Sequence, residues 1–287
     1  MKLLIFGKTG QVATELRHLA DARGISARFV DRAEADLSKA GSAAAVIEGS
    51  NADVVINATA CTAVDKAESE EGLAHQVNAI APGEMAAACQ AAGKHFLHIS
   101  TDYVFPGTGS NPWTEADTPE PKSAYGRTKL AGEKAVLNAC LEAIILRTAW
   151  VFSAHGANFV KTMLRLGATR DEVGVVADQL GGPTAARDIA EALLEIAVQK
   201  SAGASAKGIY HFSGAPTVSW ADFAEAIFKL APGTKVNRIT SAEFPTPVER
   251  PKNSALDCSR IAADFGIAQP DWRSGLKDVM AELEAKV

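Results

Sequence analysis

The chain has 287 residues and a formal net charge of −5. This length accommodates one large α/β domain, or a main domain with a smaller lobe. The acidic balance argues against nucleic acid as a partner, and no apolar run is long enough to cross a membrane. The four cysteines are scattered without metal-ligand spacing, which predicts reduced, mostly buried thiols of a cytoplasmic protein and no zinc site.

The chain opens with a pattern that is typical of dinucleotide-binding folds. Residues 3–6 are apolar and predict a buried strand rather than a signal peptide. A turn with Gly7 and Gly10 follows, and then an amphipathic helix. This order places free backbone N–H groups and the helix dipole at one spot, which favours a pyrophosphate, although a plain strand–helix turn has the same pattern. Asp31 ends the next strand, where such folds grip a ribose diol.

The β-α rhythm continues to residue 150. Further strands are predicted at residues 53–57, 95–100 and 143–147, and a long helix over 70–92 is expected to break near Pro82 and Gly83. His95 and His98 lie inside one of these strands, so we expect structural roles for both. Five β-α units in succession predict a Rossmann-like α/β fold, a doubly wound parallel sheet with right-handed crossovers.

Beyond residue 150 the rhythm loosens. Strands are predicted at 173–176 and 208–212, and helices at 158–166, 186–198, 220–230 and 272–285. We expect a dinucleotide-binding domain over residues 1–150, joined by 173–200. Residues 151–172 and 201–287 then form a smaller C-terminal lobe that binds the substrate.

Tyr125 and Lys129 stand four residues apart in a predicted helix. This spacing puts both side chains on one face, a single turn apart. A phenol is a poor proton donor near neutrality, and a nearby ammonium lowers its pKa, so the pair is suited to proton transfer. Taken alone, the pair also fits a surface tyrosine that lies along a lysine stem.

Five short segments add specificity to this pair, and they lie at residues 57–68, 100–105, 147–152, 178–184 and 250–257. With them, nearly the whole sequence resembles the dTDP-4-dehydrorhamnose reductase family of extended short-chain dehydrogenases/reductases. The resemblance implies that Thr101 hydrogen-bonds the substrate carbonyl and that Tyr125 supplies the proton. It also implies that Lys129 lowers the pKa of Tyr125 and holds the nicotinamide ribose.

The same resemblance implies two sets of contacts. We expect the dinucleotide to contact Gly7, Gly10, Gln11, Val12, Asp31, Asp36, Leu37, Ala60, Cys61, Thr62, Tyr125 and Lys129. We expect the sugar nucleotide to contact Thr101, Asp102 and Trp150, with Val64 and Glu68 nearby. Some members of the family hold a magnesium ion between subunits, with the residue at position 15 among its ligands. For Glu15 we expect a solvated helix glutamate, and we assign no metal; a homodimer is compatible with the resemblance.

The implied function is the reduction of the C4 keto group of dTDP-4-dehydro-L-rhamnose to dTDP-L-rhamnose by NADPH or NADH. Asp31 favours NADH, but Lys8 and Arg32 offset its repulsion of a 2′-phosphate, so the choice of cofactor stays open. Another nucleotide-sugar reductase, or a dehydratase of similar fold, is one alternative, although dehydratases have a glutamate where this chain has Tyr103. A non-catalytic regulatory subunit on the same fold is the other.

Overall fold

Six parallel strands form the central sheet of the protein. The computed structural model describes residues 1–285. All neighbouring strands of the sheet run parallel. From one edge to the other, the strands are β10 (Gly208–His211), β5 (Ile144–Thr148), β4 (His95–Thr101), β3 (Val54–Asn57), β1 (Lys2–Phe6) and β2 (Ser26–Val30).

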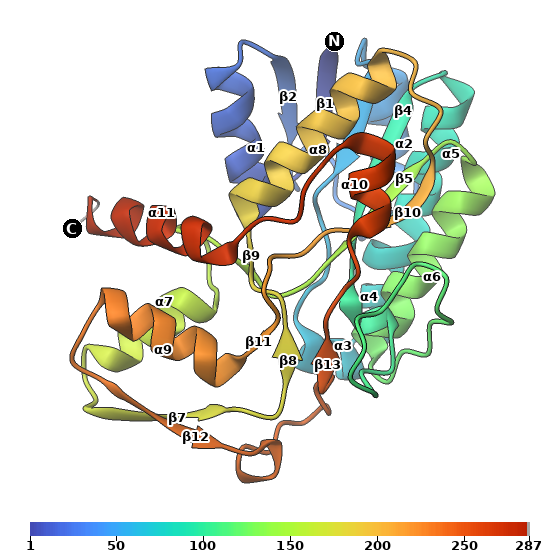
Figure 1. Ribbon diagram of the computed structural model, residues 1–287. Helices are drawn as coiled ribbons and strands as arrows, with labels where there is room; N and C mark the ends of the chain where they lie inside the picture. The colour runs from blue at the N-terminus through green and yellow to red at the C-terminus, as the bar shows by residue number, and fades with distance from the viewer. Residues whose placement is uncertain (286–287) are drawn as a thin grey trace.

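Helices cover both faces of this sheet (Figure 1). Alternate residues of a strand point to opposite faces, so Leu3 and Leu4 of β1 lie in two different apolar cores. The Leu3 core packs the sheet against α1 (Gln11–Ala22), α8 (Ala186–Ser201) and α10 (Ser259–Phe265). The Leu4 core packs it against α2 (Ser42–Glu48), α5 (Ala81–Ala91) and α6 (Ala124–Ala139). The predicted Rossmann-like doubly wound fold is therefore confirmed.

A smaller lobe lies below one end of the sheet in Figure 1. Its core centres on Phe152, Phe223 and Trp272, all fully buried. Its helices are α7 (Phe159–Gly167), α9 (Trp220–Leu230) and α11 (Trp272–Glu284). Its strands form three small sheets: β7 (Glu172–Val176) with β12 (Lys235–Ile239), β6 (Val151–Phe152) with β9 (Thr184–Ala185), and β8 (Leu180–Gly181) between β11 (Val218–Ser219) and β13 (Asn253–Ser254). A 3₁₀ turn, η3 (Ser241–Glu243), follows β12.

Two strands lie on the other side of the predicted boundary. We expected residues 173–200 to join the dinucleotide-binding domain, but β7 within them pairs with β12 in the lobe. We expected residues 201–287 to lie in the lobe, but β10 is an edge strand of the central sheet and α10 packs on that sheet. Only α8 of the 173–200 segment covers the sheet as expected. The chain therefore crosses between the two parts more often than the sequence pattern indicates.

The long helix predicted over residues 70–92 is interrupted close to Pro82, as expected. Helix α3 (Val64–Ser69) precedes α4 (Glu71–His75), and a π-helical turn, η1 (Gln76–Ile80), joins α4 to α5. Pro82 follows this turn almost directly, and because it has no N–H it cannot donate to the carbonyl of Asn78, four residues earlier. The wide turn of η1 brings the backbone carbonyl of Asn78 against Gly132 of α6, where an added Cβ would collide with it. This close approach packs α6 directly against η1.

In the part of the chain that the structure describes, no helix is both long enough and apolar enough to span a bilayer.

The cysteines are mostly buried thiols, as predicted. Cys89, Cys140 and Cys258 are buried, Cys61 is half-buried, and all four are free thiols.

Candidate active site

A cavity of about 910 Å³ opens at the carboxyl edge of the central sheet. Parallel strands bring their carboxyl ends to one edge, which is where ligands of open α/β sheets bind. Segments that follow β1, β2, β3, β4 and β5 all contribute to its wall. The wall contains all the predicted site residues except Glu68: Gly7, Gly10, Gln11, Val12, Asp31, Asp36, Leu37, Ala60, Cys61, Thr62, Val64, Thr101, Asp102, Tyr125, Lys129 and Trp150.

The turn between β1 and α1 has the shape that a phosphate group requires. Gly7 has φ +116°, a conformation that side chains rarely adopt. A Cβ built on Gly10 would meet no atom within 4 Å, so the space beside this backbone is open. Gly10 is also the N-cap of α1, and no side chain caps that helix. Its first N–H groups are therefore available for an anion, and the residues present fit a dinucleotide pyrophosphate.

Asp31 stands at the end of β2 beside a cation. Its Oδ2 lies 3.1 Å from Lys8 Nζ, and its Oδ1 accepts hydrogen bonds from the N–H groups of Ala33 and Glu34. These contacts, with Lys8 first, lower the pKa of Asp31. Both side chains of the Asp31–Lys8 pair remain more than a third exposed. A negative and a positive charge therefore lie side by side at this part of the cavity wall.

Thr101 and Tyr125 reach the cavity from two buried elements. Thr101 ends β4, and its hydroxyl accepts from the backbone N–H of Tyr103 in the 3₁₀ turn η2 (Asp102–Val104). Tyr125 stands in the first turn of α6, whose N-terminus is fixed by Ser123, the acceptor for the N–H of Gly126. The Thr101 hydroxyl interacts with the Tyr125 phenol. Sheet and helix therefore present two hydroxyl groups to one point.

The electrostatics of Tyr125 and Lys129 differ from the sequence expectation. Burial raises the pKa of Tyr125, and the Thr101 hydroxyl offsets only part of that rise. Burial also lowers the pKa of Lys129 to about 8. The Lys129 ammonium does not lower the pKa of the phenol here, because Nζ is turned to the backbone oxygen of Ile99, 2.7 Å away, and to His98 Nε2, 3.2 Å away.

Asp102 is a buried acid with one free oxygen. Its Oδ1 accepts from the Thr101 hydroxyl at 2.9 Å. Its Oδ2 has no hydrogen-bond partner among residues 1–285. Burial raises the pKa of Asp102 to about 6. A buried oxygen left without a partner at the wall of a cavity is suited to accept a hydrogen bond from a ligand.

Trp150 is held in a strained backbone conformation, with φ +49°, the only positive φ outside glycine in residues 1–285. Its ring stacks on Trp220 of the lobe, with centroids 3.5 Å apart. Gly181 also lies close to the ring, and a Cβ added to Gly181 would collide with the indole. Strain of this kind persists only where the surroundings hold it, and it is common at ligand sites.

Glu68 is the exception among the predicted site residues. Its Oε1 accepts a hydrogen bond of 2.6 Å from the N–H of Ala124, at the start of α6. Its Oε2 lies 3.7 Å from Arg127. The carboxylate therefore anchors the helix that carries Tyr125 instead of lining the cavity.

Asn57 and His98 are buried beside the site and do not line its cavity. His98 was expected to be structural, yet its ring is in contact with Lys129. Asn57 is its direct partner in the register between β3 and β4, with Asn57 Nδ2 3.1 Å from His98 Nδ1. In the sequence, each of these residues is a polar residue within or at the end of a largely apolar strand, and that pattern is the only sign of a paired role.

Comparison with known proteins decides the family. Residues 1–285 match the family model described as the RmlD substrate binding domain. The chain is 43% identical to dTDP-4-dehydrorhamnose reductase of Aggregatibacter actinomycetemcomitans, in an alignment that covers 99% of each chain. It is 40% identical to dTDP-4-dehydrorhamnose reductase of Escherichia coli K12, over 99% of this chain and 98% of that one. The chain belongs to the dTDP-4-dehydrorhamnose reductase family.

Solved structures of dTDP-4-dehydrorhamnose reductases share the fold over the full length. The enzyme of Clostridium acetobutylicum has a TM-score of 0.93 at 38% identity and covers 99% of this chain and 100% of its own. The enzyme of Bacillus anthracis, solved in complex with NADP, has a TM-score of 0.90 at 34% identity and covers 98% and 100%. The smaller lobe is thus a regular part of the architecture in the dTDP-4-dehydrorhamnose reductase family.

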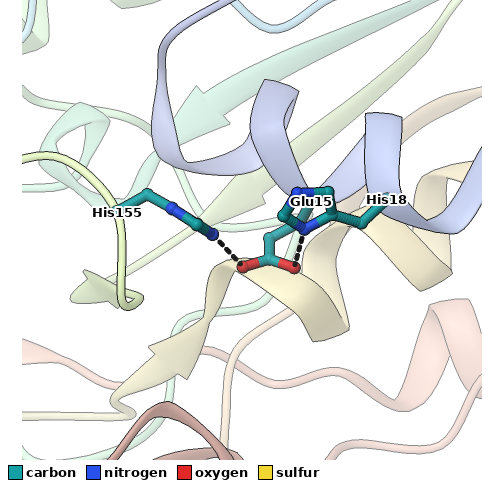
Figure 2. Close-up of side chains that lie close together, drawn as sticks. All are labelled: Glu15, His18 and His155. Atoms are coloured by element: carbon teal, nitrogen blue, oxygen red, sulfur yellow. Dashed lines mark ion pairs between the residues drawn. The ribbon is translucent and has the colours of Figure 1, made fainter. Parts of the chain in front are cut away.

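Glu15 lies outside the cavity. The expectation that its side chain is solvated is wrong. Its side chain is 6% exposed and sits between His18 and His155, at 3.9 and 3.5 Å (Figure 2). His155 Nε2 also lies 3.2 Å from Glu282. Burial raises the pKa of Glu15. The ligand-type atoms of Glu15, His18 and His155 all lie within 4.8 Å of one another, which is compact enough for a cation.

Proposed function

We propose that the protein uses NADPH or NADH to reduce the C4 keto group of dTDP-4-dehydro-L-rhamnose, which yields dTDP-L-rhamnose. The observation that carries this proposal is one cavity that joins a dinucleotide-type turn to buried Thr101, Tyr125 and Lys129. Membership of the dTDP-4-dehydrorhamnose reductase family supports the choice of substrate.

The cofactor fits the half of the cavity that β1 and β2 form. Bound there, the reduced nicotinamide supplies the hydride. The open backbone at Gly10 and the uncapped start of α1 favour the pyrophosphate. Asp31 accepts from the adenosine ribose, while Lys8 beside it offers a counter-charge to a 2′-phosphate. This pairing supports the use of both NADH and NADPH.

The proton comes from Tyr125. Because burial raises the pKa of this phenol, its proton is in place at any working pH. Negative charge on the carbonyl oxygen then meets the Tyr125 O–H and the Thr101 hydroxyl, which lie together at the cavity wall. General acid catalysis of this kind contributes ~10²–10⁴-fold. Lys129 holds the nicotinamide ribose and returns a proton to Tyr125 after each turnover.

The sugar nucleotide fits the half of the cavity that faces the lobe. Trp150 lines this half of the cavity, and the free Oδ2 of Asp102 offers an acceptor for a sugar hydroxyl. Beyond Tyr103, a further cleft of about 290 Å³ is lined by Lys122, Arg250 and Lys252, among others. Arg250 Nη1 is buried without a hydrogen-bond partner in residues 1–285. These cations favour the diphosphate of a dTDP-sugar.

We also propose that the protein is a homodimer of the cytoplasm. The family resemblance supports the dimer, and the four free cysteines support a reducing compartment. Light scattering of the purified chain measures the first point directly; a mass of one chain, 30.0 kDa, would contradict it.

The decisive test of the proposed function is a reductase assay with the purified protein alone. Oxidation of NADPH and NADH is followed with dTDP-4-dehydro-L-rhamnose, with its C3/C5 epimer, and with a UDP-linked 4-keto sugar. We expect turnover that is fastest with dTDP-4-dehydro-L-rhamnose and that Tyr125→Phe abolishes. Faster turnover of another sugar would indicate a different nucleotide-sugar reductase. A parallel reaction contains dTDP-glucose and NAD, and loss of water there without net change of the cofactor would indicate a dehydratase. No turnover of any sugar would favour a regulatory subunit.

A further inference from the structure

A buried chain of hydrogen bonds leads from the end of β3 to the Lys129 amine. Asn57, His98 and Lys129 are all at most 1% exposed. Asn57 Nδ2 lies 3.1 Å from His98 Nδ1, and His98 Nε2 lies 3.2 Å from Lys129 Nζ. Both sides of the imidazole are thus occupied, and the position of its single proton decides which neighbour donates.

The orientation of Asn57 is fixed by a donor that cannot reverse. The backbone N–H of Thr59 points at Asn57 Oδ1 from 3.0 Å, and the Thr59 hydroxyl lies 2.6 Å from the same oxygen. A backbone N–H only donates. The atom facing it must therefore be the oxygen of the amide, and the NH₂ group of Asn57 must face His98.

The amide in turn fixes the tautomer of His98. An NH₂ group donates, so His98 Nδ1 must accept and the ring proton must sit on Nε2. A second proton on the ring would face the Asn57 NH₂ group, and burial together with the nearby Lys129 lowers the pKa of His98 well below its usual value. Nε2–H therefore points at Lys129 Nζ.

An N–H aimed at an amine favours the form of that amine that has a lone pair. Neutral Lys129 accepts from His98 Nε2–H while it donates to the oxygen of Ile99. The ammonium form has no lone pair and meets that N–H head-on. We propose that Asn57 and His98 are positioning residues of the reduction: together they aim a ring N–H at Lys129 and make its proton easy to release.

The other charged groups around Lys129 do not produce this effect. Glu133, one turn along α6, favours the charged amine, but it is held by Arg147 in a buried ion pair at 2.6 Å. Tyr125 is neutral because burial raises its pKa, so it places no charge beside the amine. Besides burial, the N–H of His98 is thus the group that opposes the ammonium.

The consequence concerns the return of the proton to Tyr125, so this inference rests on the proposed function. When Tyr125 gives its proton to the carbonyl oxygen, a phenolate remains. The Lys129 ammonium then transfers one proton to that phenolate, becomes the amine, and is reprotonated from water. A lysine with an ordinary pKa of about 10.4 releases this proton less readily. Asn57 and His98 act through Lys129 and touch neither substrate nor cofactor in this scheme.

Nitrogen NMR of the protein labelled with ¹⁵N in its histidine rings tests the tautomer without any variant or activity. The chain has six histidines, and His211 is the internal control. Its Nδ1 lies 3.0 Å from the backbone oxygen of Trp113, which only accepts, so His211 carries its proton on Nδ1. We expect opposite tautomers for the two buried rings. A His98 proton on Nδ1 would overturn the inference, whereas an inactive protein would overturn only the proposed function.

Two variants then test the effect on Lys129. Asn57→Asp keeps the acceptor for Thr59 and turns the other atom into an acceptor, so the His98 proton moves to Nδ1 and Nε2 accepts from an ammonium. Asn57→Leu removes the NH₂ group without adding a charge. We expect the alkaline limb of the kcat–pH profile to move upward by about one pH unit in both. A limb that moves in Asn57→Asp alone would reflect the added charge and would contradict the proposal, as would unchanged profiles.

Discussion

The two halves of the active-site cavity differ in how far water reaches their charged groups. On the cofactor side, the side chains of Asp31 and Lys8 are 38% and 45% exposed, and solvent screens their interaction. On the proton-transfer side, Lys129 and Asp102 are 1% and 3% exposed, and burial dominates the pKa of each. The exposed half can therefore accept more than one ligand, whereas substitutions in the buried half are expected to change rate or stability strongly. The predictions below test this contrast.

The largest effect is expected from Tyr125→Phe, which keeps the ring and removes the proton. We expect kcat to fall by ~10²-fold or more with little change in cofactor affinity. Tyr103→Phe is the matched control, because Tyr103 packs edge-on against Tyr125, with centroids 5.4 Å apart, and lines the same cavity. Equal losses in the two variants, measured by steady-state kinetics, would show that Tyr125 is not the acid.

The next effect concerns Lys129 and pH. Because the pKa of Lys129 is lowered to about 8, its ammonium is present below that pH and is lost as the pH rises through it. We expect kcat to fall along the same limb. Lys129→Met removes the limb, lowers kcat at pH 7 by ~10-fold or more, and raises the KM for the cofactor. A variant with normal rate and normal KM would contradict the role assigned to Lys129.

A smaller effect on stability is expected at Asp102. Its pKa is raised to about 6, so between roughly pH 4 and 6 the folded protein binds a proton that the unfolded chain does not. Stability attributable to this group therefore falls as the pH rises through that window. Asp102→Asn removes the buried charge and is expected to stabilise the protein by about 1–3 kcal/mol at pH 7.5. Thermal unfolding should show the gain shrink at pH 4.5; a gain independent of pH would argue against this origin.

The smallest effect belongs to the exposed half. We expect kcat/KM for NADH and NADPH to lie within about tenfold, or ~1.4 kcal/mol, because Asp31 and Lys8 oppose each other at one site. Asp31→Asn should shift the preference toward NADPH and Lys8→Met toward NADH, each by about tenfold or less because the pair is solvated. Kinetics at one ionic strength decide this. A preference above a hundredfold in the wild type would show that one charge dominates.

Features of the fold that depend on neighbouring residues were predicted from the sequence, and features that depend on contacts between distant residues were not. Local patterns predicted the central sheet, the turn at Gly7 and Gly10, and the α6 segment, because strand and helix periodicities are read within a few residues. The pairing of β7 with β12 and the place of β10 were missed because each depends on a partner far along the chain. The family resemblance supplied most of the predicted site residues, and all the predicted site residues except Glu68 line the cavity.

The errors within the site have the same origin. Glu68 stands in a motif that otherwise lines the cavity, but its partner at Ala124 is 56 residues away. Glu15 reads as a surface residue of α1 until His155 of the later chain covers it. His98 lies in a largely apolar strand. Its contacts with Asn57 of β3 and Lys129 of α6 depend on the folded structure and cannot be predicted from the strand pattern. Burial of a polar group is a tertiary property, and it is what a single sequence conveys least.

The most direct test of the proposed function follows the hydride itself. The purified protein is incubated with dTDP-4-dehydro-L-rhamnose and NADPH that carries deuterium at both hydrogen positions on C4 of the nicotinamide, and the sugar product is examined by NMR. We predict dTDP-L-rhamnose with a single deuterium at C4 of the sugar, and none when Tyr125→Phe replaces the wild type over the same time. Deuterium at another carbon, or a product formed without deuterium, would contradict the reduction that we assign to this cavity.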